Sequence, residues 1–331
     1  AQHEDDITLI KYQMSWPGSG DPYYTEEGGV RRGYYGVSWV PWQVADGNFI
    51  ETSMSAVNAF FDAAIVNPSF ASIVGTHSID GTTIDITTTV LPYANFANNR
   101  VHIVVFENVT TENVASNGET EFHHVMMKMV PDANGTSVDF TDRTPFTISQ
   151  QVDLSGTNVE EFDDLGVAIL VQDQTGQTIH QSVYSLEDAV FGTEAALDNV
   201  MINGEDFPDF NSEVYEYNIE LPEGTTEIPS MEGIPMDENA TVIVVPATDL
   251  PGTTIIDVFG EDLASHKQYV FNYTVQVGIG DEAAKSIKVY PNPSQGDFYI
   301  SNIEDATVSI YNVSGKMIAN YENNNGRISA Q

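Results

Sequence analysis

Three histidines are the side chains of this sequence best suited to bind a transition metal or to move a proton near neutral pH. His123 and His124 are adjacent, and His102 lies earlier in an apolar run. Neighbouring residues of a strand point to opposite faces, so His123 and His124 cannot readily chelate one ion. We therefore favour buried or edge histidines over a metal site.

An acidic run precedes the strand predicted at Val167–Val171. Its members are Glu160, Glu161, Asp163 and Asp164. A Ca²⁺ site needs several oxygens converging on one point, and a loop can supply them. No EF-hand spacing is present, however, and carboxylates abound in this chain. A solvated acidic loop is the preferred interpretation; the alternative has Ca²⁺ as a possible cofactor, and no other cofactor is predicted.

Aromatic side chains crowd the N-terminal part and could form a platform for a glycan or a surface protein, or simply a core. They are Trp16, Tyr23, Tyr24, Tyr34, Tyr35, Trp39 and Trp42. No G-x-S-x-G, no H-E-x-x-H and no phosphate-binding glycine loop accompanies them. The sequence therefore offers no catalytic residue.

Composition narrows the classes of partner. The 331 residues contain 11 Lys and Arg against 49 Asp and Glu, a formal net charge of −38. Such a charge repels phosphate backbones and anionic lipid surfaces, so nucleic-acid binding is not expected. The absence of cysteine excludes disulfides and thiolate chemistry within this sequence. No apolar run approaches the roughly 20 residues of a transmembrane helix.

The elements that would position these side chains are mostly strands. Residues 1–68 read as an α/β segment, with strands at Ile7–Met14 and within Val37–Ala45, a hairpin turn at Ala45–Asn48 and a helix at Ser53–Ile65. Residues 69–190 and 196–278 each carry runs of alternating apolar and polar residues between Gly, Asn and Asp turns, typical of antiparallel β-sandwiches. Glu187–Ala196 reads as the linker between them.

Residues 285–331 form a smaller β module. Apolar residues alternate around Val289 and again around Phe298 and Ile300, with prolines ending the first strand. A third apolar run ends at the turn Ser314-Gly315.

The pattern V-Y-P-N-P-x-x-G-x-F-x-I, followed by V-x-I-Y-N-x-x-G-K, resembles the type A sorting domain of the type IX secretion system of Bacteroidota. The resemblance implies export to the outside or the surface of a Gram-negative cell. The partner would be the secretion translocon or its outer-membrane shuttle. Such domains continue through further strands, so the resemblance implies a truncated module. The residues that carry the signal are Tyr290, Pro291, Asn292, Pro293, Gly296, Phe298, Ile300, Gly315 and Lys316.

Two further resemblances concern the rest of the chain. The chain contains the motifs W-P-G-x-G-D-P-Y-Y, R-R-x-Y-Y-G-V and R-V-H-I-V-V-F-E. These motifs resemble Omp28-related surface proteins, which pair a thioredoxin-like part with a β-sandwich. By that resemblance Val40 and Pro41, joined by a cis peptide bond, line the thioredoxin-like groove. F-x-S-E-V-Y-E-Y-N-I-E-L-P is similar to cadherin-like bacterial sandwiches.

The predicted fold is thus mostly β and multidomain. A partial thioredoxin-like segment (1–68) precedes an Omp28-like sandwich (69–190), a cadherin-like or Ig-like sandwich (196–278) and a truncated sorting domain (285–331). The predicted function is binding or structure outside the cell. Two alternatives remain: a thiol-disulfide oxidoreductase whose Cys-x-x-Cys lies upstream of Ala1, and a Ca²⁺-stabilised adhesin. The sequence identifies neither the ligand nor the oligomeric state.

Overall fold

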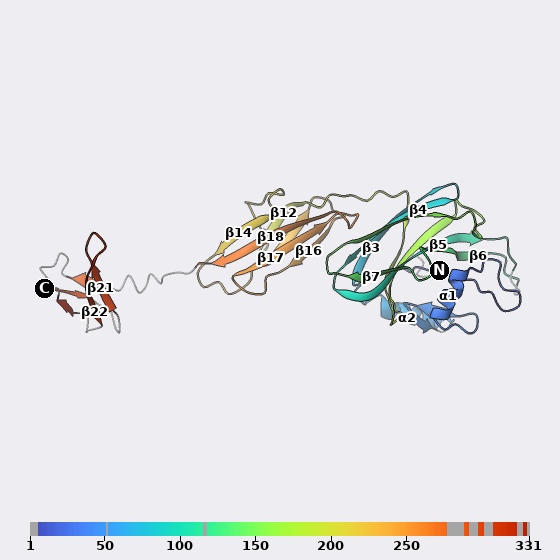
Figure 1. Cartoon of the computed structure of the whole chain (residues 1–331), viewed down its shortest axis with the longest axis horizontal. Coiled ribbons are helices and arrows are strands. Elements are labelled where there is room, and N and C mark those ends of the chain that lie inside the picture. The colour runs from blue at the N-terminus through green and yellow to red at the C-terminus, as the bar shows by residue number, and fades with distance from the viewer. Residues whose placement is uncertain are drawn as a thin grey trace. The chain divides into compact units, whose positions relative to one another are not determined.

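The computed structural model describes residues 6–50, 52–114, 118–276, 288–290, 297–300, 307–322 and 327–329. Two short helices occur near the N-terminus of this part, drawn in blue in Figure 1, and the other regular elements are strands. The chain forms two compact units. One comprises Ala1–Tyr217, Pro229–Pro246 and Thr254–Val270; the other comprises Asn218–Ile228, Ala247–Thr253 and Phe271–Gln331. The prediction of a mostly β fold with several separate sheets is confirmed.

The N-terminal segment contains helix α1 (Glu26–Tyr34), strands β1 (Gln43–Ala45) and β2 (Asn48–Ile50), and helix α2 (Met54–Ala64). Each helix begins where a hydroxyl caps it: Thr25 accepts from the Gly28 amide and Ser53 from the Ala56 amide. The hairpin turn Asp46-Gly47 has positive φ at both residues, 44° and 85°, as a two-residue turn between twisted strands requires. The predicted hairpin and the helix predicted at Ser53–Ile65 are confirmed.

The strand predicted at Ile7–Met14 is wrong. This segment makes a single isolated parallel bridge, Lys11 to Val125. The Lys11 backbone exchanges two hydrogen bonds with the neighbouring strand, to His124 O at 2.7 Å and from Met126 N at 3.0 Å. Ile10 and Tyr12 meanwhile pack against a buried apolar cluster that includes Phe106 and Met126. Side-chain burial therefore holds this segment in place, without a continuous strand ladder.

The first sandwich has one sheet in the order β10-β9-β5-β6, with β7 also paired to β5. Its strands are β5 (Phe96–Thr110), β6 (Phe122–Val130), β7 (Thr136–Phe140), β9 (Leu165–Asp173) and β10 (Ile179–Tyr184). All of the pairings are antiparallel. The strand predicted at Val167–Val171 lies within β9.

The second sheet of this sandwich runs β11-β3-β4-β8. It consists of β3 (Ala71–Asp80), β4 (Thr83–Pro92), β8 (Phe146–Asp153) and β11 (Leu186–Glu187). A single cluster of buried side chains, among them Ile86, Ile103 and Ile169, draws on both sheets. Between β10 and β11 the chain crosses from one sheet to the other, where Leu186 and Glu187 pair in parallel with Thr76 and His77.

Residues after the crossing form two further sheets. One has the order β13-β12-β15, with β12 (Leu197–Ile202), β13 (Glu205–Asp206) and β15 (Met231–Pro235). The other has the order β14-β18-β17-β16, with β14 (Glu216–Leu221), β16 (Thr241–Val245), β17 (Gly252–Phe259) and β18 (His266–Val275). The alternation predicted for the last of these strands is confirmed, since Tyr269, Phe271 and Tyr273 are at most 1% exposed.

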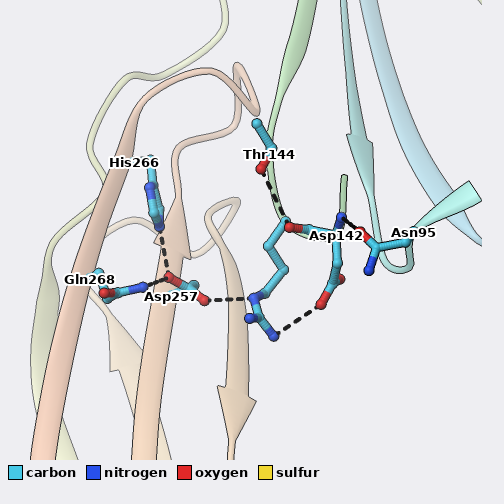
Figure 2. A network of polar contacts seen from close by, with 7 residues as sticks. Asn95, Asp142, Thr144, Asp257, His266 and Gln268 are labelled. Carbon is cyan, nitrogen blue, oxygen red and sulfur yellow. Dashed lines mark hydrogen bonds and ion pairs between the residues drawn. The ribbon is translucent and has the colours of Figure 1, made fainter. Parts of the chain in front are cut away.

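An ion pair between a partly exposed arginine and a buried aspartate lies beside these strands (Figure 2). Arg143, in the turn after β7, places Nε 2.9 Å from Asp257 Oδ2 of β17, and the Asp257 side chain is only 2% exposed. Asp257 Oδ1 accepts from Gln268 Nε2 at 2.8 Å and lies 2.8 Å from His266 Nε2. Asp142 Oδ2 lies 3.3 Å from Nη1 of the same arginine. A buried charge is tolerable only when it is paired and hydrogen-bonded in this way.

In the C-terminal module, β20 (Asp297–Ile300) pairs with β19 (Val289–Tyr290) and with β23 (Arg327–Ser329), and β21 (Thr307–Tyr311) pairs with β22 (Met317–Glu322). The turn Asn312–Lys316 is closed by Asn312 Oδ1, which accepts from the amides of Ser314 and Lys316. The apolar runs around Val289 and Phe298 are strands, as predicted. Strands β22 and β23 follow this turn. The truncation of the module that the resemblance implies stays a prediction.

Candidate functional site

A cavity of about 290 Å³ lies in the first sandwich, beside the crossing from β10 to β11. Strands of both sheets supply its lining: His77 from β3, Phe106 and Asn108 from β5, and Gly166 from β9. The crossing itself adds Tyr184, Ser185 and Glu187. His124 of β6 completes the lining, so strands β3, β5, β6, β9, β10 and β11 converge on one hollow whose shape is fixed by two hydrogen-bonded sheets.

His77 is the most buried polar side chain of this lining, at 4% exposure. Its Nδ1 lies 2.6 Å from Ser185 Oγ, whereas its Nε2 has no hydrogen-bond partner among the residues that the structure describes. Burial lowers the pKa of His77, against a smaller raising effect of Glu187 and Asp188, so the ring is neutral at pH 7. Buried polar atoms without a partner are uncommon and call for an explanation.

Three rings stand together along the cavity. Phe106 lies 5.4 Å between centroids from both His124 and Tyr184, and His124 and Tyr184 are within 17° of parallel. The rings have room because Gly166 carries no side chain: a Cβ there would collide with the Phe106 ring. Tyr184 is anchored at its far end, since its hydroxyl accepts from Leu9 N at 2.6 Å and donates to Leu9 O at 3.1 Å.

Glu187 belongs to two hollows. It lines the cavity described above and also a second cavity of about 340 Å³, together with Ile79, Gly81, Phe162 and Asp163. The charged residues among these linings are Glu187 and Asp163, both acidic; neither lining includes a lysine or an arginine. The hollows are therefore electrically negative within a chain that is already strongly acidic.

The connectivity of the His77–Ser185 pair differs from that of a serine nucleophile and its base. A serine nucleophile needs a histidine whose second nitrogen is held by a carboxylate or a similar group. Here Ser185 lies on Nδ1, and the second nitrogen of His77 is unpartnered among the described residues. Ser185 is itself only 7% exposed.

The acidic run predicted as a Ca²⁺ alternative has other partners. Glu160 accepts from the Tyr23 hydroxyl and from the amides of Thr111 and Glu112, both at 2.8 Å. Asp164 Oδ2 accepts from the Val109 amide at 2.9 Å, and Asp163 lines the second cavity. Glu161 contributes its amide, at 2.7 Å, to the fully buried Glu107. Within the described ranges no group of three or more potential metal ligands occurs.

The other histidine candidates are separated. His123 is exposed and 3.0 Å from Glu121, while His124 has φ of +54° and faces Phe106. His102 is buried, 3.4 Å from Arg31, and burial with the neighbouring arginines lowers its pKa to about 3. The three histidines therefore have three different environments.

The aromatic residues of the N-terminal segment divide into two sets. Trp39, Trp42 and Phe49 pack edge-on or tilted at 4.6–6.1 Å, and Trp39 and Phe49 remain 47% exposed. Tyr23, Tyr34 and Tyr35 instead contact the sandwich or Arg31. Val40 and Pro41 are exposed and joined by a cis bond. Their lining of a ligand groove stays a prediction.

The structure describes some of the predicted sorting-signal residues. Tyr290 stacks on Tyr299 at 5.7 Å, Ile300 is 9% exposed, and Phe298 is half-buried. Gly315 has φ of +79°, which its turn requires, and Lys316 is exposed beside it. Pro291, Asn292, Pro293 and Gly296 lie outside the described residues. Their role as a recognition signal stays a prediction.

Sequence reasoning missed His77, Ser185 and Glu187. A signal for the first existed: Ala71, Ile73, Gly75 and His77 occupy alternate positions, and all four are buried. Glu187 was assigned to a linker, and its pairing with His77 joins segments far apart in the chain. No local pattern could reveal that contact.

Fold and site together define a mostly β protein of several sheets with a cavity in its first sandwich. Residues 288–331 match the secretion system C-terminal sorting domain, which confirms that predicted resemblance. None of the described helices is long and apolar enough to cross a membrane.

Other similarities are more distant. A gellan lyase of Bacillus sp is 34% identical over 84 residues, 25% of this chain and 3% of that protein's length. HBP35 of Porphyromonas gingivalis is 11% identical at a TM-score of 0.40, over 75% of this chain and 80% of that one. A domain of the outer membrane lipoprotein Omp28 of the same species is 13% identical at 0.24, over 38% and 94%. These TM-scores lie below the level at which a common fold is inferred.

Proposed function

We propose that this chain is a secreted or cell-surface protein, exported by the type IX secretion system of a Bacteroidota-type cell, that acts through binding or structure. The observation that carries the proposal is the match of residues 288–331 to a secretion sorting domain. The secretion translocon or its outer-membrane shuttle is the proposed partner of that module. The preceding parts, 1–68, 69–190 and 196–278, are the proposed cargo.

A binding role is favoured over catalysis by the cavity beside the β10–β11 crossing. Its polar groups converge from several strands, which is typical of a ligand site. The His77–Ser185 pair has the wrong connectivity for a nucleophile and its base, as described above.

Deletion of residues 288–331 tests the export proposal in the native host. We expect the shortened protein to accumulate inside the cell, while the full chain reaches the surface or the medium. The measurement is the ratio of cell-associated to external protein by fractionation and immunoblotting. A full-length Glu232→Gln variant, changed at an exposed strand position, is the matched control for expression and stability. Undiminished export of the shortened chain would refute the proposal.

A further inference from the structure

We propose that the cavity beside the β10–β11 crossing binds a ligand with an ammonium or guanidinium group, with Glu187 as its counter-charge and His77 Nε2 as a hydrogen-bond acceptor. This inference rests on the proposed binding function and names the chemistry that the site would take.

Charge is the first argument. Glu187 is the charged residue that lines the cavity, and it also lines the second cavity together with Asp163. The net charge of −38 adds a long-range field of the same sign, which repels anions and attracts cations. A cationic group is therefore the charged ligand whose approach this surface favours.

The unpartnered nitrogen of His77 is the second and independent argument. The side chain is 4% exposed, and Nδ1 is occupied by Ser185 Oγ at 2.6 Å. When Nδ1–H donates to that hydroxyl, the neutral ring leaves a lone pair on Nε2, which can only accept. Ammonium and guanidinium groups consist entirely of donors, so they complement this acceptor.

The rings are the third argument. Phe106 and Tyr184 line the cavity, and faces of such rings attract cations within about 6 Å of the centroid. Phe106 is 3% exposed, so a cation beside it would be partly screened from water, which strengthens this attraction. The volume of about 290 Å³ lies at the small end of ligand sites, so it fits one side-chain-sized group.

Two sources can supply such a group: a free small cation, or a lysine or arginine side chain of a peptide. The test uses the full chain at about 150 mM salt, where the Debye length is about 8 Å and distant charges contribute little. N-acetyl-arginine amide is titrated by calorimetry. N-acetyl-citrulline amide, which has a urea of similar shape and no charge, is the ligand control. Agmatine represents the free cation, and an extended Gly-Arg-Gly peptide represents the chain-borne one.

Glu187→Gln is the decisive variant because Glu187 is exposed and glutamine keeps the side-chain shape, so we expect the fold to be retained. Glu232→Gln removes one exposed strand carboxylate outside the cavity lining and is the matched control. A charged hydrogen bond contributes about 1.5–3 kcal/mol, so we expect Glu187→Gln to weaken arginine-amide binding about tenfold or more. Glu232→Gln should leave the affinity within about twofold.

A second measurement reports on His77 directly. Binding should shift the Nε2 resonance of His77 in ¹⁵N-detected histidine spectra. Equal affinities for the arginine and citrulline ligands, equal losses in both variants, or an unmoved His77 resonance would each overturn the proposal. Export is measured separately, so a Glu187→Gln chain that is secreted normally but shows no ligand effect refutes this site while leaving the proposed function standing.

Discussion

The two helices differ in an unexpected way: the more polar helix has buried residues, and the more apolar helix has none. Helix α1 has the sequence EEGGVRRGY and buries Gly28 and Arg31, whereas α2, with the sequence MSAVNAFFDAA, has no buried residue. The polar helix is held by specific contacts, and the apolar helix leaves Met54 68% exposed. The apolar composition of a segment thus indicates how much free energy its burial would contribute. Whether the segment is buried depends on packing partners elsewhere in the chain.

The contacts of α1 show what such partners are. The Arg31 guanidinium donates to Gln172 Oε1 at 2.7 Å and to the Tyr35 hydroxyl at 2.8 Å, and it lies over the Tyr34 and Tyr35 rings. Glu27 adds an ion pair of 2.5 Å to Lys128 of β6. No ion pair to a carboxylate is found for Arg31 within the described residues, so hydrogen bonds and ring faces stabilise its buried charge.

The largest expected effect comes from removing that arginine. Arg31→Ala should lower the free energy of unfolding by about 3 kcal/mol, because it leaves Gln172 and His102 without their donor and opens a gap between two rings. Urea unfolding measures the change. Arg32→Ala is the control: the Arg32 side chain is exposed and its guanidinium lies 5.6 Å from the centre of the Trp16 ring, so its loss should cost under about 1 kcal/mol. Equal losses in the two variants would mean that the buried contacts of α1 do not hold it.

A pH-dependent effect of comparable size should come from His102, which lies beside the same arginine. Its folded pKa of about 3 lies below the unfolded value of 6.5, so the unfolded chain binds more protons between these values. Stability from this group is therefore full above pH 6.5 and declines as the pH falls, by up to about 1.4 kcal/mol per pH unit.

His102→Gln retains an acceptor for Arg31 but cannot titrate. Unfolding curves between pH 7 and 4 should therefore be flatter for this variant than for the unaltered chain. His77 and His180 also have lowered pKa values and remain in both proteins, so the difference isolates His102. Parallel pH profiles would show that His102 is not buried as a neutral ring.

The two helix caps can be compared by removing the capping hydroxyl of each, a change that typically costs about 1 kcal/mol of stability. Thr25→Ala should lower global stability by that amount, because α1 is docked on the sandwich. Ser53→Ala should act locally instead, speeding amide exchange in α2 about fivefold with little change in the urea midpoint. Hydrogen exchange and urea unfolding of both variants provide the readings. A global loss from Ser53→Ala would show that α2 is coupled to the core after all.

Exposed apolar residues in α2 and just after it should matter least. Met54→Gln and Val66→Thr change side chains that are 68% and 76% exposed, so each should alter the unfolding free energy by less than about 0.5 kcal/mol. Ile86→Ala, in the core of the first sandwich, is the contrasting control and should cost about 2–5 kcal/mol. A loss above 1 kcal/mol for Met54→Gln would place that side chain in a packed interface.

Features set by nearby residues were predictable from the sequence. The Asp46-Gly47 turn, the Ser53 cap and the alternation of the sandwich strands depend on dihedral preference and burial period alone. The burial of Arg31 was not predictable, because its hydrogen-bond partners come from β5, β9 and the residue that follows its own helix. The cavity was missed for the same reason: Glu187 meets His77 only after the chain has crossed between sheets.

The ion pair between Arg143 and Asp257 limits how freely the sandwiches could be exchanged during evolution. Leu91 of the first sandwich packs with Phe259 and Leu263, so apolar surface accompanies the pair. A substitute neighbour that covered this surface without an arginine would leave the Asp257 carboxylate enclosed and unneutralised, at a cost of several kcal/mol. An exchange of either sandwich should therefore retain the fold only when the new neighbour supplies a matching charge. We expect the two sandwiches to be inherited together for this reason.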